Sequence, residues 1–93
     1  MKHLLVTNDF PPKIGGIQSY LWELWRRLPA DDATVLTTAY PGAEAFDRAA
    51  GFRIDRVPDR VLPPRAALRD RIDALAAEVD ADLVLLDPAL PVG

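Results

Sequence analysis

The sequence contains no cysteine, and this absence removes two classes of protein from consideration. Without thiols there is no disulfide framework and no thiolate metal site. The single histidine, His3, begins an apolar run with no carboxylate near it in sequence, and we interpret it as structural.

No apolar run approaches the roughly eighteen residues that span a bilayer, and the first residues lack a signal-peptide core. We therefore expect a soluble, cytoplasmic protein.

Positive charge is also scarce. Eleven Lys and Arg residues stand against fourteen Asp and Glu, and the basic residues are scattered, so the formal net charge is -3. Nucleic-acid surfaces need clustered Lys and Arg, so no nucleic-acid partner is expected.

What the chain does have is 49% apolar residues over 93 positions. That content is enough for one packed unit and argues against disorder.

Short apolar runs alternate with helical patterns along the chain. Continuous runs at 3–7, 33–39 and 82–86 are typical of buried strands, whereas 52–57 alternates strictly and indicates a half-exposed strand near the sheet edge. Helical spacing predicts helices over 17–28, 43–50 and 64–80. This order predicts an α/β fold, with a Rossmann-like parallel sheet and helices on both faces.

The predicted helix over 17–28 carries an apolar stripe and two tryptophans. The stripe runs through Ile17, Leu21, Leu24 and Leu28, and Pro29 ends the helix. Trp22 and Trp25 lie three positions apart beside it, a spacing more typical of core or domain-contact residues than of a ligand platform.

The last residues follow the fourth predicted strand closely. A doubly wound sheet places a further helix there to cover the strand, and the sequence stops at Gly93. We therefore expect residues 1–93 to be the amino-terminal part of a larger protein.

Two unusual segments follow predicted strands. "NDFPPKIGG" comes after the first strand and "DPALPVG" after the fourth. In an open parallel sheet, ligands bind outside the carboxyl ends of the strands, at the point where strand order reverses. That point typically lies between the first and fourth strands, so the two segments are predicted to face each other across one crevice.

Gly15 and Gly16 stand directly before the helix predicted over 17–28. The first amides of a helix have no internal partners and carry the positive end of its dipole, and glycine lets a phosphate approach closely. The first turn, "IQSY", contains no acidic residue that would occupy this position. Phosphate binding is one interpretation, and the other is that the two glycines only form a tight turn and an N-cap.

Four other polar residues in these segments are open to two interpretations each. Asn8 and Asp9 either contact a polar ligand or close the turn by bonds to the backbone. Lys13 either adds positive charge to the crevice or is solvated. Asp87 is either a functional carboxylate at a strand end or a turn residue before proline.

Several familiar motifs are missing. "KIGGIQ" lacks the spacing G-x-G-x-x-G, and no acidic residue closes the second strand, so NAD binding is not expected. There is no G-x-x-x-x-G-K-[ST] loop, and no catalytic triad, metal cluster or carboxylate pair is evident.

The stretch "LLVTNDFPPKIGGIQSYL", followed by a helix and a V-x-T strand, resembles the amino-terminal domain of family 4 glycosyltransferases of the GT-B fold. Within that family it looks most like the actinobacterial GDP-mannose-dependent phosphatidylinositol mannoside mannosyltransferases. The resemblance covers essentially the whole chain and is most specific over residues 4–21.

This resemblance implies roles for residues of the first segment. It assigns donor-diphosphate binding to Gly15, Gly16 and the amide of Ile17. It also implies that the acceptor side of the crevice is lined by a second set of residues, namely Asn8, Asp9, Phe10, Gln18 and Tyr20. Lys13 and Asp87 remain candidate crevice residues on their position alone.

The implied reaction is transfer of mannose from GDP-mannose to a phosphatidylinositol mannoside with retention of configuration and with no metal or cofactor. The parent enzyme would contact the inner face of the plasma membrane peripherally. The family's donor-binding residues belong to a carboxy-terminal domain absent from these 93 residues, so this chain alone is expected to be inactive. Two alternatives remain: a non-catalytic fragment or binding module, and a family 4 transferase with another nucleotide sugar and a soluble acceptor.

Overall fold

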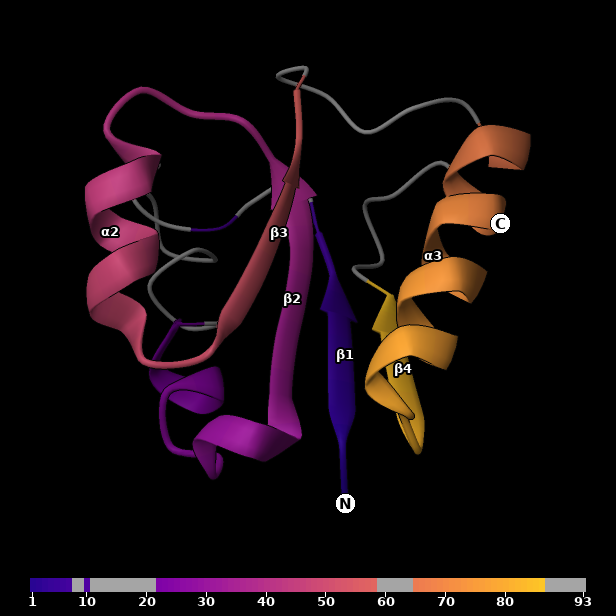
Figure 1. The fold of residues 1–93 in the computed structure, drawn as a ribbon, viewed down its shortest axis with the longest axis horizontal. Helices are drawn as coiled ribbons and strands as arrows, with labels where there is room; N and C mark the ends of the chain where they lie inside the picture. Colours follow the sequence, from indigo (N-terminus) through magenta and orange to yellow (C-terminus); the bar gives the residue numbers. More distant parts are fainter. Residues whose placement is uncertain (8–9, 11–21, 59–64, 87–93) are drawn as a thin grey trace.

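A computed structural model describes residues 1–7, 10, 22–58 and 65–86, and within these ranges four strands form one parallel sheet. The elements, in chain order, are β1 (His3–Val6), η1 (Ala30–Asp32), β2 (Ala33–Thr38), α2 (Ala43–Ala50), β3 (Arg53–Val57), α3 (Arg65–Val79) and β4 (Leu83–Leu86). The sheet order is β3-β2-β1-β4, with α2 and α3 on opposite sides of the strands (Figure 1). The predicted α/β class and parallel sheet are confirmed.

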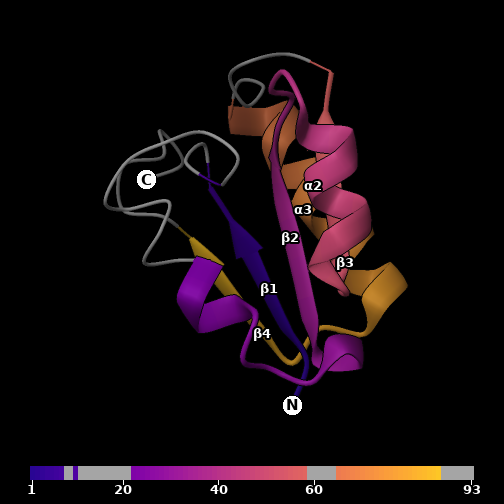
Figure 2. The same ribbon diagram turned by 90° about the vertical axis from the view of Figure 1, so that its left-hand side faces the viewer.

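Strand alternation divides the core into two layers. Leu4 and Val6 of β1 point to the α3 side, where they pack with Leu36, Leu68 and Leu75. The intervening Leu5 points to the other side, into a cluster with Val35, Trp25 and Phe10. All strands run toward the same end of the molecule, as Figure 2 shows for β1 and β2. Both faces of β1 and β2 are therefore covered, as their continuous apolar runs predicted.

The two edge strands differ from each other in burial. β3 is half-exposed at one edge, as the alternation of residues 52–57 predicted. At the other edge, the prediction of a buried strand at 82–86 was wrong, because all four β4 side chains are 37% to 47% exposed. The reason is that α3 packs on core residues of β1, β2 and β3, whereas no β4 residue belongs to either buried cluster of the described residues.

The helix predicted over 17–28 is described only from residue 22. Residues 22–25 are helical, the Arg26 amide donates to the Trp22 carbonyl at 3.0 Å, and the turn ends before Pro29 as predicted. The predicted apolar stripe was wrong at Leu24, which is 44% exposed, whereas Trp25 is buried. The helix turns its tryptophans to the sheet because an indole removes more apolar area from water than a leucine does. Trp25 also lies edge-on to His3, with ring centroids 6.5 Å apart.

Arg56 ties α2 to the sheet. Its side chain is only 10% exposed, and Nε and Nη2 each donate to a different carboxylate oxygen of Asp47 at 2.9 Å. Nη1 donates to the Thr38 carbonyl at 2.8 Å. Because the guanidinium is mostly removed from water, it needs these acceptors, and the fork geometry matches a carboxylate well. The α2 helix itself ends at Gly51, whose φ of 84° is the left-handed conformation that glycine adopts without strain.

None of the described helices is both long and apolar enough to cross a membrane.

Asp47→Ala is expected to lower the free energy of unfolding by about 1–3 kcal/mol, because it leaves the Arg56 guanidinium partly buried without its carboxylate. Urea denaturation at pH 7 measures the change. Arg27→Met serves as the control, since Arg27 pairs with Glu23 at an exposed site and its loss should leave stability unchanged within error. Equal effects of the two substitutions would contradict the assignment.

Leu85→Lys is expected to reduce self-association of the chain. An apolar edge strand exposed on both faces favours association at concentrations on the order of 100 µM, and a charge there opposes it. Light scattering compares this variant with Ala67→Lys, which adds the same charge at an exposed position of α3. The expectation fails if both lysines reduce scattering equally, or if the unmodified chain stays monomeric.

Candidate functional site

The carboxyl ends of β1 and β4 lie side by side. Val6 is in register with Leu36 on one side and with Leu86 on the other. The connections from β1 to β2 and from β3 to β4 carry helical residues on opposite faces of the sheet. The strand order therefore reverses between β1 and β4, as predicted, and the segments that follow these two strands begin at neighbouring positions of one edge.

Most of the predicted site residues lie outside the described part of the chain. These are Asn8, Asp9, Lys13, Gly15, Gly16, Ile17, Gln18, Tyr20 and Asp87. Their assignments to the donor diphosphate, the acceptor side or the crevice stay predictions. The structure does describe β1 and β4, which these segments follow. It also describes Phe10 and Trp22, which flank residues 11–21 in sequence.

Phe10 is buried among other rings. It is 1% exposed, and its ring centroid lies 6.4 Å from that of Trp22, 6.2 Å from Phe46 and 6.4 Å from Phe52. We call these four residues the aromatic cluster. The steep interplanar angles, between 73° and 82°, give edge-to-face contacts that aromatic rings favour. The acceptor-lining role predicted for Phe10 is not tested by this packing, which shows its ring as part of the core.

Threonine hydroxyls gather at the carboxyl ends of β1 and β2. Thr7, Thr37 and Thr38 are all buried, and the Thr7 amide donates to the Leu36 carbonyl at 3.1 Å. By strand alternation Thr7 and Thr37 share the face of the aromatic cluster. The Thr37 hydroxyl is buried without a hydrogen-bond partner among the residues that the structure describes. An unmet buried hydroxyl costs about 1–3 kcal/mol, so this edge presents a polar group that can still accept or donate a bond.

Sequence reasoning did not single out these threonines. Their only sequence signal is small polar residues at the end of an otherwise apolar strand, "VLTT" in β2 and the Thr7 that follows β1. The same letters are common in buried strands, because threonine is β-branched and packs well there. Their position at a reversing sheet edge became visible only with the strand order.

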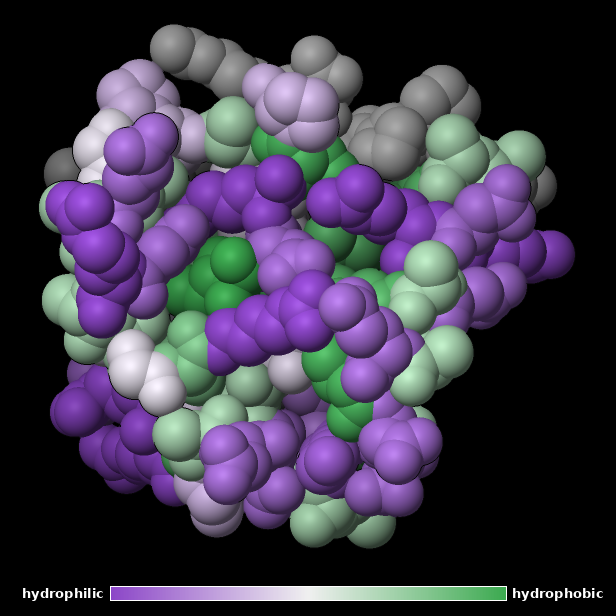
Figure 3. Space-filling view, in the orientation of Figure 1, coloured by the Kyte–Doolittle hydropathy of each residue, from purple (hydrophilic) through white to green (hydrophobic). Residues whose placement is uncertain are grey.

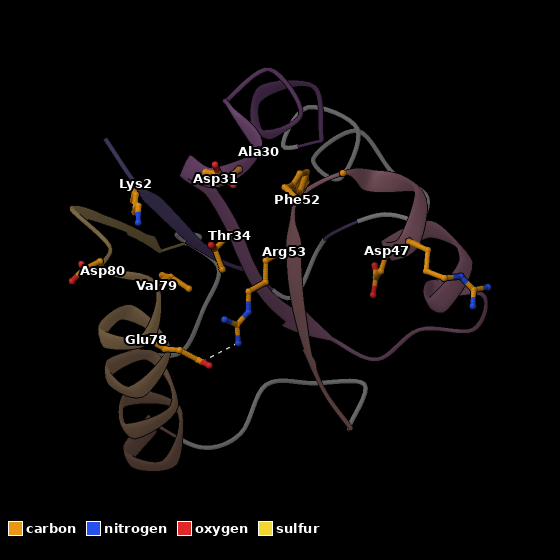
Figure 4. Close-up of a pocket in the computed structure, with 13 residues that line it drawn as sticks. Lys2, Ala30, Asp31, Thr34, Asp47, Phe52, Arg53, Glu78, Val79 and Asp80 are labelled. Atoms are coloured by element: carbon orange, nitrogen blue, oxygen red, sulfur yellow. Dashed lines mark hydrogen bonds and ion pairs between the residues drawn. The ribbon is translucent and has the colours of Figure 1, made fainter.

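A cleft of about 790 Å³ lies at the opposite, amino-terminal end of the strands (Figure 4). Its walls carry charges of both signs, including Lys2, Arg53 and Glu78. Arg53 is already paired there: Nε donates to Asp55 at 2.8 Å and Nη2 donates to Glu78 at 2.9 Å. These hydrogen bonds, that to Asp55 first, raise the pKa of the guanidinium above its ordinary value. Carboxylates of Asp31, Asp47 and Asp80 also line the cleft, so its charge is mixed and the Arg53 guanidinium is already paired with two acidic side chains.

The face of the molecule seen in Figure 1 is mixed in hydropathy. Figure 3 shows hydrophilic residues spread over the face seen in Figure 1, with smaller apolar areas between them. Near the aromatic cluster, a hydrogen bond from Arg26 lowers the pKa of the Glu23 carboxyl, and Arg27 adds to this effect. No group of three or more potential metal ligands gathers within the described ranges.

The chain is similar to curated proteins from three actinobacterial genera. The relative from Mycobacterium tuberculosis, a GDP-mannose-dependent alpha-(1-6)-phosphatidylinositol monomannoside mannosyltransferase, is 47% identical over 94 aligned residues. The protein of that name from Mycolicibacterium smegmatis is 39% identical. A GDP-mannose-dependent monoacylated alpha-(1-6)-phosphatidylinositol monomannoside mannosyltransferase from Corynebacterium glutamicum is 33% identical. These alignments include 95% to 97% of the chain and 24% of each relative.

No protein-family model matches the chain. It spans about a quarter of the length of the curated relatives it matches, at their amino-terminal end. Identities of 33% to 47% over nearly every residue are well above what unrelated sequences share by chance. The chain therefore belongs to the family of these actinobacterial mannosyltransferases and corresponds to the amino-terminal quarter of its members.

Proposed function

We propose that these residues form the acceptor-side part of a mannosyltransferase that moves mannose from GDP-mannose to a phosphatidylinositol mannoside. The observation that carries the proposal is that the chain is 33% to 47% identical, over at least 95% of its residues, to three enzymes named for that donor and lipid. Because the chain matches only a quarter of their length, catalysis is assigned to the whole protein and not to these residues alone.

The fold supports a ligand site at the carboxyl edge of β1 and β4. Strand order reverses there, so the segment after β1 and the segment after β4 begin at neighbouring strand ends, the place where open parallel sheets bind ligands. Buried threonines supply hydroxyls at the same edge. In this proposal Gly15, Gly16 and the Ile17 amide bind the donor diphosphate, as the resemblance implies.

In this proposal the amide groups act by electrostatic stabilisation of the leaving diphosphate. Breaking the bond between mannose and GDP leaves negative charge on the diphosphate, and amide donors already aimed at that position stabilise it with little reorganisation. Asn8, Asp9, Phe10, Gln18 and Tyr20 are proposed to lie toward the acceptor, with Lys13 and Asp87 in the crevice. The reaction then needs no metal or cofactor, and it takes place at the inner face of the plasma membrane where the glycolipid lies.

The donor-diphosphate assignment is tested by titrating the isotopically labelled natural gene product that contains these residues with GDP and following its amide resonances. Amides of Gly15, Gly16 and Ile17 are expected to shift saturably, because they would donate to phosphate oxygens. Guanosine is the matched control, since it keeps the base and ribose and lacks the diphosphate. Shifts that are equal for the two ligands, or that fall elsewhere on the chain, would refute the assignment.

The reaction is tested with the natural gene product that contains these residues. It is expected to transfer radiolabelled mannose from GDP-mannose to phosphatidylinositol mannoside, and Gly16→Val is expected to reduce kcat/KM roughly 100-fold by displacing an amide donor. Ala67→Val adds bulk at an exposed position of α3 and should leave the rate unchanged. Transfer from a different nucleotide sugar, or to a soluble acceptor only, would overturn the proposed donor or acceptor.

A further inference from the structure

A row of polar side chains crosses the sheet near the carboxyl ends of its strands. Thr37 of β2 is in register with Arg56 of β3. Thr7 directly follows β1, and its amide donates to the Leu36 carbonyl at 3.1 Å, which continues the pairing of β1 with β2. Thr7 and Thr37 are therefore neighbours across the two strands. We call Thr7, Thr37 and Arg56 the polar row.

The polar row lies next to an apolar row on the same face of the sheet. Two positions earlier on each strand are the apolar side chains of Leu5, Val35 and Ile54. An apolar side chain needs no hydrogen bond, whereas a polar group taken out of water needs a partner. The polar row is thus where this layer of the core has to satisfy hydrogen bonds.

Thr37 and Arg56 differ in how their hydrogen bonds are satisfied. Arg56 donates to both carboxylate oxygens of Asp47 and to the Thr38 carbonyl. The Thr37 hydroxyl is buried and has no hydrogen-bond partner within the described ranges, and the residue is only 1% exposed. Because Thr37 lies between two polar side chains, its hydroxyl is in a polar part of the core, where a water molecule can find more than one partner.

We propose that the polar row binds one internal water molecule, held between the hydroxyls of Thr7 and Thr37. Buried waters typically bond about three polar groups that other atoms leave unsatisfied. Neighbouring strands lie about 4.8 Å apart, and a water that bonds two oxygens at about 2.8 Å each spans that gap. A threonine hydroxyl donates one hydrogen bond and accepts two, so Thr7 can bind the water in addition to its other contacts.

The competing explanation is that Thr37 only fills space. Threonine is β-branched and packs well in strands, and its hydroxyl would then stay unmet at a cost in stability. The two explanations predict opposite effects of replacing the hydroxyl by a methyl group. Both concern these residues alone and do not depend on the proposed mannosyl transfer.

High-resolution crystallography of the natural gene product that contains these residues is the direct test. An ordered water oxygen is expected within about 3 Å of both hydroxyls. It should remain in Thr37→Ser, which keeps the hydroxyl, and disappear in Thr37→Val, which has nearly the same shape without it. If the unmodified protein holds no ordered oxygen there, or if the oxygen persists in Thr37→Val, the proposal is overturned.

Amide hydrogen exchange of the same protein shows whether the Thr37 hydroxyl is satisfied. If a water bonds it, Thr37→Val removes a hydrogen bond, and exchange of the Thr7 amide is expected to quicken on the order of fivefold. An unmet hydroxyl predicts slower exchange, because valine would remove a buried polar group that bonds nothing. Val35→Thr is the matched control: it adds a hydroxyl to the apolar row and should quicken exchange by leaving that hydroxyl unmet.

A cycle of two substitutions tests whether one water joins the two hydroxyls. Thr7→Val is expected to quicken exchange of the residue 7 amide several-fold less in Thr37→Val than in the unmodified protein, because the shared water has then already lost a partner. Equal effects in the two backgrounds would refute the shared water, and so would slower exchange in Thr37→Val.

Discussion

The pairing of β1 with two neighbours is the constraint on which the rest of the structure depends. β1 is only four residues long, yet it joins β2 on one side and β4 on the other, and its central side chains enter the cores of both faces. The first strand of the chain thereby becomes an interior strand. Because every strand is parallel, the segments that leave β1 and β4 must start at one edge, and the proposed ligand site follows from that arrangement.

Much of the fold was predictable because its signals are local. Continuous apolar runs in β1 and β2 identified interior strands, and the alternation in β3 identified an edge strand. The same reasoning failed for β4, since Leu83–Leu86 has the letters of a buried strand and burial depends on what packs against it. It also failed at Leu24, because helical spacing alone allowed two faces and the larger indoles decided which one is buried.

Only part of the candidate site could be predicted from the sequence. Glycines before a predicted helix and strand ends at a reversing edge are sequence and topology signals, and they make Gly15 and Gly16 candidates whose role stays a prediction. The packing of Phe46 against Phe10 could not be predicted, because the two rings are far apart in sequence and no local pattern encodes their contact. Thr37 was missed for a related reason: its buried hydroxyl has the same sequence signal as a packing residue.

β3 carries the polar contacts of both helices. Arg56 faces Asp47 of α2 on one side of the strand, and Arg53 faces Glu78 of α3 on the other. Among the described residues β3 pairs with β2 alone, through the register from Thr34–Arg53 to Thr38–Val57. In mechanical terms, one strand carries ion pairs to the helical layers on both faces of the sheet. A force that peels β3 from β2 would break the arginine contacts of both helices together, and α3 would then be held to β1 and β2 by its apolar contacts with Leu4, Val6 and Leu36.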